Sequence, residues 1–245
     1  LNLGSFGATP SVVLDEQARL RDELERDPIR FLAPERELEP KIDRVRGRLS
    51  GLVGADAADI AFVRNATDGV NAVLRSFPLR RDDEIVITSH GYNACSNAVR
   101  FATERVGAVT RIADVPFPVH AAHQVVSSIE QALSEKTRLV LIDHVTSPTG
   151  LVFPVEQIVD LAHRRGIRVM IDGAHAPGML PLDLNHLEAD YYTANHHKWL
   201  CAPKASGFLW VRPEFQHEVH PTIISHAYNR PRPGRSQFMA EFDWM

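Results

Sequence analysis

The sequence predicts an α/β fold in which a mostly parallel β-sheet is covered by helices on both faces. Short β-rich runs alternate with longer helical patterns between residues 60 and 211. Runs such as residues 139–142 are apolar on both sides, as strands buried between two helical layers must be. This alternation is typical of βα units whose strands lie parallel in one sheet.

The predicted elements divide the chain into an N-terminal arm and a large domain. Two amphipathic helices, at 14–26 and 40–53, are joined by a link rich in Pro and Glu, so we assign residues 1–55 to an arm and 56–245 to the large domain. In that domain we predict strands at 60–63, 84–88, 109–113, 138–142, 168–171, 191–194 and 207–211, and helices at 68–77, from 93, at 125–133 and at 155–165. Residues 231–235 predict a loop.

Composition excludes several classes of partner. The 245 residues are 44% hydrophobic and 24% charged with a net charge of -4, which gives no attraction to nucleic acid or to an anionic membrane. No run reaches the roughly 18 apolar residues of a membrane helix. Cys95 and Cys201 are the only cysteines, too few for a disulfide framework and without zinc-site spacing. We therefore predict a cytoplasmic protein without a metal site.

Both ends of the chain suggest missing sequence. The chain starts at Leu1 without an initiating Met, and residues 242–245 lack the polar tail or capping signal that usually closes a domain. We expect further residues on each side.

Polar side chains follow nearly every predicted strand. In open parallel sheets, ligands bind at the carboxyl ends of the strands, so these positions are the candidate site. The polar sets are residues 65–67, 89–92, 144–147, 172–175 and 195–198.

Two of these sets hold the residues with the clearest chemistry. Lys198 directly follows a predicted strand, and Asp172 ends another that is strongly apolar. A buried lysine is costly unless neutral or covalently used, and a buried carboxylate needs a cationic partner. Taken singly, Lys198 could be a solvated surface group and Asp172 could cap a turn. Together they predict a pyridoxal 5'-phosphate (PLP) site, in which Asp172 holds the pyridinium nitrogen and Lys198 forms the Schiff base.

A phosphate position is predicted beside this pair. Ala66 and Thr67 begin a predicted helix, where free backbone N–H groups and a hydroxyl suit a phosphate dianion. Asn195 and His197 could add donors to it. Alternatively, Thr67 could be an N-cap and His197 an ordinary loop imidazole.

Aromatic residues are available for the cofactor ring. Tyr92 or His90 could supply a flat ring to stack on the pyridine, and His175 could donate to the phenolate oxygen. The alternatives are a packed, half-buried ring for Tyr92 and a satisfied loop imidazole for His175. The sequence leaves the choice between His90 and Tyr92 open.

The ordered series of motifs resembles the class V aminotransferase family of PLP-dependent enzymes, of fold type I. Within it, the isopenicillin-N epimerase branch is the most similar, and the likeness spans nearly the whole chain. The residues that carry it are 1–7, Asn65-Ala66-Thr67, 144–150, 172–178, His197-Lys198-Trp199 and 202–209.

The resemblance implies a role for each matching position. It makes Lys198 the Schiff-base lysine, Asp172 the partner of the pyridine nitrogen and Tyr92 the stacking ring. It places Ala66, Thr67, Asn195 and His197 around the phosphate, and Ser147 and His175 near the ring oxygen. Related cysteine desulfurases usually have Asn at the position of Ser147 and often Gln at that of His175, so these departures argue against a desulfurase.

The resemblance also implies parts that this sequence lacks. Family members carry a smaller C-terminal domain with an arginine for the substrate carboxylate. They also have a Gly-Thr pair, soon after a Trp like Trp244, that reaches the neighbouring subunit's phosphate. A homodimer with shared active sites and a small amino-acid-type substrate follow from this comparison.

These observations predict an enzyme similar to isopenicillin-N epimerase. A carbon–sulfur lyase or an aminotransferase of the same superfamily is the alternative, and the reaction and the substrate remain open. A non-catalytic or truncated PLP-fold binding module is the alternative from another class. A nicotinamide-binding domain is disfavoured because no Gly-x-Gly-x-x-Gly follows an early strand.

Overall fold

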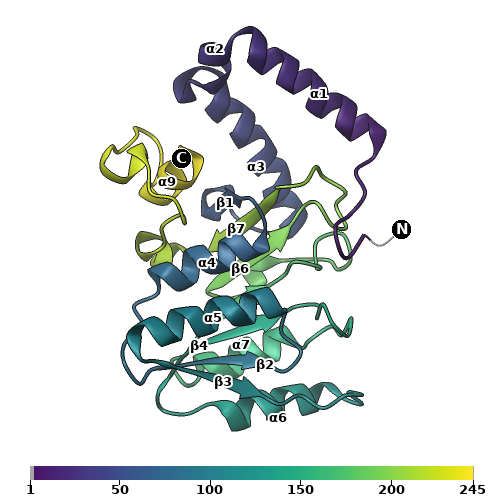
Figure 1. Ribbon diagram of the computed structural model, residues 1–245, viewed down its shortest axis with the longest axis vertical. Helices are drawn as coiled ribbons and strands as arrows, with labels where there is room; N and C mark the ends of the chain where they lie inside the picture. Colours follow the sequence, from purple (N-terminus) through teal and green to yellow (C-terminus); the bar gives the residue numbers. More distant parts are fainter. Residues whose placement is uncertain (1–2, 245) are drawn as a thin grey trace.

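The computed structural model describes residues 3–244, in which the strands form one seven-stranded sheet in the order β1-β7-β6-β5-β4-β2-β3 (Figure 1). Leu1, Asn2 and Met245 lie outside the described residues, and with them the first two positions of the 1–7 motif. Strands β3, β2, β4, β5 and β6 run parallel, and β7 is antiparallel to both of its neighbours. The strands are β1 (Ile60–Val63), β2 (Glu84–Thr88), β3 (Val109–Ala113), β4 (Thr137–Asp143), β5 (Arg168–Asp172), β6 (Tyr191–Asn195) and β7 (Gly207–Val211). The predicted mostly parallel sheet is confirmed.

Helices cover both faces of the sheet, as the two-sided apolar strands require. One apolar cluster joins α4, α5 and α9 to the sheet, and the other joins α3, α6, α7 and α8 to the opposite face. No helix in residues 3–244 is long and apolar enough to cross a membrane. The helices are α1 (Ser11–Arg26), α2 (Pro28–Leu32), α3 (Glu39–Val53), α4 (Ala66–Ser76), α5 (Asn93–Val106), α6 (Ala122–Ala132), α7 (Val155–His163), α8 (Leu184–Leu187) and α9 (Gln237–Asp243), with short η segments at Pro34–Leu38, Ala57–Asp59, Pro213–Glu218 and His226–Asn229.

Side-chain alternation along the strands assigns residues to the two clusters. In β2, Ile85 and Ile87 pack into the α4–α5 cluster, whereas Val86 packs into the opposite one. In β5, Met170 faces the first cluster and Ile171 the second. Successive strand side chains point to opposite faces, so an apolar run of this length fills both cores at once.

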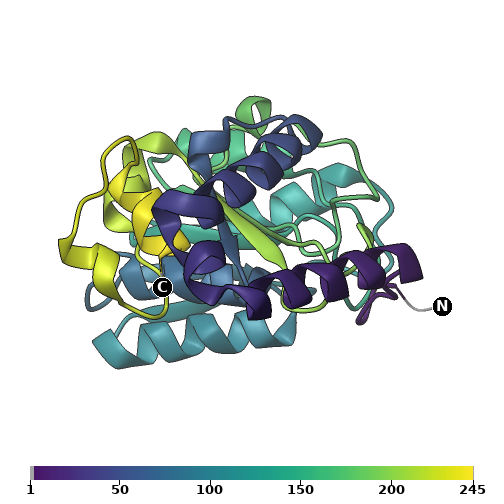
Figure 2. The ribbon, with the colours of Figure 1, turned by 90° about the horizontal axis from the view of Figure 1, so that it is seen from above.

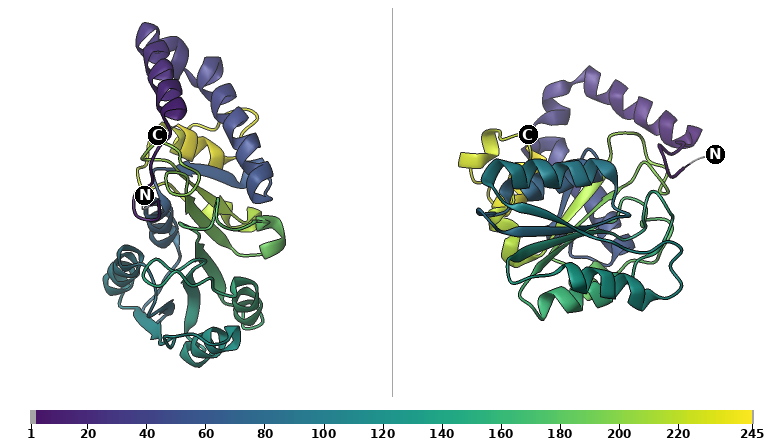
Figure 3. Two further views of the ribbon diagram at one scale, coloured as in Figure 1. Left: turned by 90° about the vertical axis from the view of Figure 1, so that its right-hand side faces the viewer. Right: turned by 60° about the horizontal axis from the view of Figure 1, so that its bottom comes forward.

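The first helices form an arm that extends from this body. Figures 1 and 3 show α1 standing off from the sheet, Figure 2 looks down on α1 from above, and none of its residues is buried. The arm returns through α3, whose Leu49 and Val53 are buried in the core. Arg46, also on α3, is buried and pairs with Asp243 at the end of α9. The sequence did not predict helix α9, and this ion pair holds α9 against α3.

Helix α4 lies unusually close to β6 because Gly69 has no side chain. A Cβ at Gly69 would lie 2.2 Å from Thr193 Oγ1, so any larger residue must push the helix away from the sheet. At the start of the helix, Ala66 N donates to Asn195 Oδ1 over 2.9 Å. The N-terminus of α4 is therefore held against the carboxyl end of β6.

We predict that Gly69→Ala destabilises the protein by about 1–3 kcal/mol through overpacking against Thr193. It should also weaken PLP binding, because the N-terminus of α4 moves. Gly47→Ala is the matched control, since Gly47 lies within α3 and a Cβ there has nothing within 4 Å apart from its chain neighbours and the backbone of its own helix. That change should stabilise the protein by about 0.5–1 kcal/mol. Urea unfolding and PLP titration measure both effects, and equal stabilities for the two variants would contradict the packing argument.

Candidate active site

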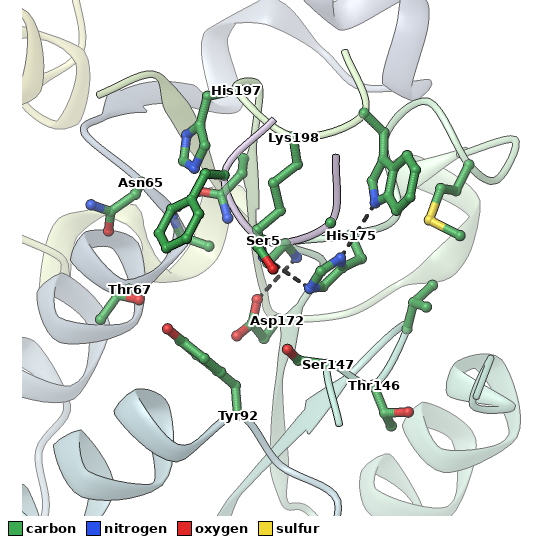
Figure 4. Close-up of a pocket in the computed structure, with 18 of the residues that line it drawn as sticks. Ser5, Asn65, Thr67, Tyr92, Thr146, Ser147, Asp172, His175, His197 and Lys198 are labelled. Atoms are coloured by element: carbon green, nitrogen blue, oxygen red, sulfur yellow. Dashed lines mark hydrogen bonds between the residues drawn. The ribbon is translucent and has the colours of Figure 1, made fainter. Parts of the chain in front are cut away.

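One cavity of about 540 Å³ opens at the carboxyl ends of the parallel strands. Figure 4 shows Thr67, Tyr92, Asp172, His175 and Lys198 arranged around it. All nine residues expected to bind the cofactor line this cavity, which brings together segments from six parts of the chain. They are Ala66, Thr67, Tyr92, Ser147, Asp172, His175, Asn195, His197 and Lys198.

Lys198 lies in the turn that follows β6, where the sequence placed it. Only 9% of its surface is exposed, and Nζ lies 2.9 Å from His175 Nε2. Burial lowers the pKa of Lys198, while the charges of Asp172 and Asp143 oppose that shift. A lysine with a lowered pKa has more of the neutral amine, the form that attacks an aldehyde.

Asp172 ends β5 and is almost completely buried. Its Oδ1 accepts a hydrogen bond from Ala174 N at 3.0 Å, and its Oδ2 accepts one from Cys95 Sγ at 3.1 Å. Burial raises the pKa of Asp172, and these hydrogen bonds together with Lys198 partly offset the shift. A buried carboxylate supported in this way is ready to pair with a cation such as a pyridinium nitrogen.

Sequence analysis missed two groups beside Asp172. Asp143 ends β4 in register with Asp172 and is also buried. Burial and the charge of Asp172 raise the pKa of Asp143. Hydrogen bonds from the backbone N–H groups of Tyr92 and Ser147 lower it and partly offset the rise. Its place at a strand end was a signal that could have found it. No feature of the sequence marks Cys95 as a neighbour of Asp172. Cys95 lies on α5, and the face of this helix that contacts Asp172 is set by how the helix packs on the sheet.

The N-terminus of α4 provides the expected anion position, with one difference from the prediction. Asn65 caps the helix by accepting from Asp68 N at 2.9 Å, and Ala66 N already donates to Asn195. Thr67, in the first turn of the same helix, also lines the cavity, and its hydroxyl hydrogen-bonds to Cys95, the residue that contacts Asp172. His197 lies across from it, as Figure 4 shows.

Of the two candidate rings, Tyr92 lines the cavity and His90 does not. His90 is buried outside the cavity, with Nδ1 at 2.8 Å from Thr149 Oγ1 and Nε2 at 3.0 Å from the Val115 carbonyl oxygen. Tyr92 is 42% exposed and its ring centroid lies 6.0 Å from Lys198 Nζ. Tyr92 is therefore the flat ring available for stacking, and His90 joins neighbouring loops.

His175 lies between Lys198 and the indole of Trp199. Its Nε2 contacts Lys198 Nζ, and its Nδ1 accepts from Trp199 Nε1 at 3.3 Å. Burial lowers the pKa of His175 to about 4, with Lys198 as a second cause. The imidazole is therefore neutral near pH 7 and offers an uncharged donor within the cavity.

The N-terminal segment forms a further wall that residue chemistry alone did not predict. Gly4, Ser5 and Phe6 line the cavity, and the chain then passes directly over the Lys198 turn. Gly7 has φ of +70°, and a Cβ there would lie 1.7 Å from the His197 carbonyl oxygen. Only glycine permits this approach, which explains the glycine in the 1–7 motif.

The residues fit PLP at each of its chemically distinct ends. Asp172 would pair with the ring nitrogen, and the amine of Lys198 would bond to the aldehyde. The N-terminus of α4 with Thr67 would hold the phosphate, and Tyr92 would cover the ring face. When bound, PLP supplies the aldehyde for covalent attachment and a ring that takes up electron density. Fold and site together define a PLP-dependent protein of fold type I.

Comparison with known proteins agrees with this class. The family model for class V aminotransferases matches residues 9–244. Isopenicillin N epimerase of Streptomyces clavuligerus is 34% identical over 94% of this chain, and L-cysteine desulfhydrase of Arabidopsis thaliana is 28% identical over 100% of it. The cystine C-S lyase C-DES, solved with its product cysteine persulfide, superposes with a TM-score of 0.87 at 26% identity over 98% of this chain.

The chain belongs to the class V aminotransferase family. The resemblance in the sequence and the prediction of PLP are thus confirmed, and a mutant of C-DES was solved with glycine covalently linked to its PLP cofactor. The chain spans 58% of the epimerase, 57% of the desulfhydrase and 65% of C-DES. It therefore corresponds to between half and two thirds of the length of these relatives.

Proposed function

We propose that the protein is an enzyme that acts on an amino-acid-containing substrate through PLP attached to Lys198. The observation that carries the proposal is the pairing of buried Asp172 and buried Lys198 at the ends of adjacent parallel strands. A buried carboxylate and amine so placed are costly without a group that uses both.

The other residues of the cavity have roles that follow from their positions. Thr67 and His197 bind the phosphate, helped by the positive end of α4, while Asn195 holds that helix in place. Tyr92, Ser147 and His175 all line the cavity. Tyr92 would stack on the ring, and Ser147 and His175 would act at the ring oxygen. Lys198 would hold the cofactor through its amine, and the same amine would move a proton at the substrate carbon.

Two reaction types are supported. An epimerase-like reaction follows from the sequence resemblance and from the epimerase relatives, and a carbon–sulfur lyase reaction follows equally from the desulfhydrase relative and from C-DES. Both need a proton removed from the substrate carbon, and they differ in whether a sulfur substituent then leaves. An aminotransferase and a non-catalytic binding module are the remaining alternatives.

We also propose the domain organisation and assembly. Residues 1–55 form the arm, residues 56–245 form the PLP-binding large domain, and a smaller C-terminal domain in the whole protein carries the arginine for the substrate carboxylate. The functional unit is a homodimer with shared active sites. Support comes from the family resemblance and from the greater length of the relatives.

Attachment of the cofactor is tested by reduction with borohydride in the presence of PLP, followed by peptide mapping. We expect the pyridoxyl label on Lys198 and not on Lys41, Lys136 or Lys204, because Lys198 alone lines the cavity. Lys198→Arg, which keeps the charge but cannot form the adduct, serves as the control. A label on another lysine would refute the assignment.

The reaction type is tested with the protein extended to its natural stop codon. We expect turnover of an amino acid by one of two readouts: exchange of its α-proton with change of configuration, or release of sulfide and a 2-oxo acid from cysteine or cystine. Lys198→Ala should abolish either activity. Binding of PLP without either activity, or transfer of the amine to a keto acid, would instead support one of the alternatives.

Assembly is tested by comparing the molar mass in solution of the extended protein with that of the 245-residue chain. We expect the extended form to be dimeric, with more PLP retained per chain, because contacts from two subunits meet at one site. Light scattering and cofactor content after dialysis provide the measurement. A monomeric extended protein with full activity would contradict the shared-site proposal.

A further inference from the structure

The turn that carries Lys198 also carries an indole donor. Trp199 follows Lys198 directly, and its Nε1–H donates to His175 Nδ1 over 3.3 Å. Gly178 lets the loop after β5 pack closely against the backbone of Trp199. A Cβ at Gly178 would lie 3.0 Å from the Trp199 carbonyl carbon and oxygen, and the φ of Gly178 is +86°. The loop after β5 and the turn after β6 are thus fitted to each other around this hydrogen bond.

The donor character of the indole determines where His175 carries its proton. An indole nitrogen can only donate, so His175 Nδ1 must accept with its lone pair. A neutral imidazole has one N–H, which is then on Nε2. Burial keeps the imidazole neutral by lowering the pKa of His175 to about 4.

The protonated nitrogen of His175 faces the reactive amine. Nε2 lies 2.9 Å from Lys198 Nζ, and an ammonium group has no lone pair with which to accept a hydrogen bond. This contact therefore favours the neutral amine. Burial favours it as well, whereas the other groups that act on Lys198, namely Asp172, Asp143 and Cys95, raise its pKa.

We propose that Trp199 is a positioning residue that fixes His175 as the Nε2–H tautomer and so makes it a hydrogen-bond donor toward the reacting end of Lys198. The tautomer follows from contacts within the chain, and its use toward cofactor and substrate rests on the proposed function. No bond is made or broken in this step. In the loaded site, the same N–H is available to an acceptor on the cofactor or the substrate.

The tautomer is read directly by NMR of protein labelled with ¹⁵N-histidine, with and without PLP. His175→Gln identifies the His175 signals among the 12 histidines by their absence. We expect the one-bond N–H coupling on Nε2 of the parent protein in both states. A proton on Nδ1 in the parent protein would overturn the proposal without any need for a variant.

Trp199→Phe then tests the role of the indole. Loss of the donor should populate the Nδ1–H tautomer, whose free Nε2 can accept from the ammonium form of Lys198. The pKa of Lys198 in the PLP-free protein should therefore rise, as measured by its pH-dependent acetylation relative to Lys136. An unchanged tautomer and an unchanged Lys198 pKa in a folded variant would refute the role.

Trp210→Phe is the matched control. Trp210 is buried, and its Nε1 has no hydrogen-bond partner within the described part of the chain. This variant should leave the His175 tautomer and the Lys198 pKa at their parent values, and a shift as large as that of Trp199→Phe would overturn the proposal. Failure of the borohydride label at Lys198, with the tautomer intact, would instead refute the proposed function.

Discussion

The parallel pairing of β5 with β6 is the constraint on which the site depends. It aligns Asp172 with Thr193, so the buried carboxylate lies at the edge where the chain turns into Lys198. Burial drives both groups toward their neutral forms, and the charge of each opposes that change in the other. The protonation states of Asp172 and Lys198 can therefore change when a ligand binds between them. This suits a cofactor with a cationic ring nitrogen and an aldehyde.

Strand β6 also sets the distance between the two ends of the site. Asn195, its last residue, holds the N-terminus of α4 through Ala66, and Lys198 follows only three positions later. Gly69 allows the helix to sit this close, and Gly7 allows the N-terminal segment to close over the turn. Glycines distant in sequence therefore bring the anion position and the amine to one cavity.

The relatives of this chain carry the names of more than one reaction. An isopenicillin N epimerase and an L-cysteine desulfhydrase match nearly the whole chain in sequence, and the cystine C-S lyase C-DES matches it in fold. The outcome of PLP chemistry depends on where protons are held around the substrate carbon. In the proposed function, a neutral donor such as His175, oriented by Trp199, would be one of the groups that hold such protons.

The sequence by itself determined the seven strands and the longer helices between them, and it pointed to the strand ends, with Asp172 and Lys198, as the candidate site. It could do so because apolar periodicity is local and parallel strands all present their carboxyl ends at one edge. Only the tertiary structure showed that Tyr92 and not His90 lines the cavity, that the Ala66 N–H is bonded to Asn195, and that Cys95 lies against Asp172. Those outcomes depend on helix packing and on contacts between loops far apart in the chain, which no local pattern records.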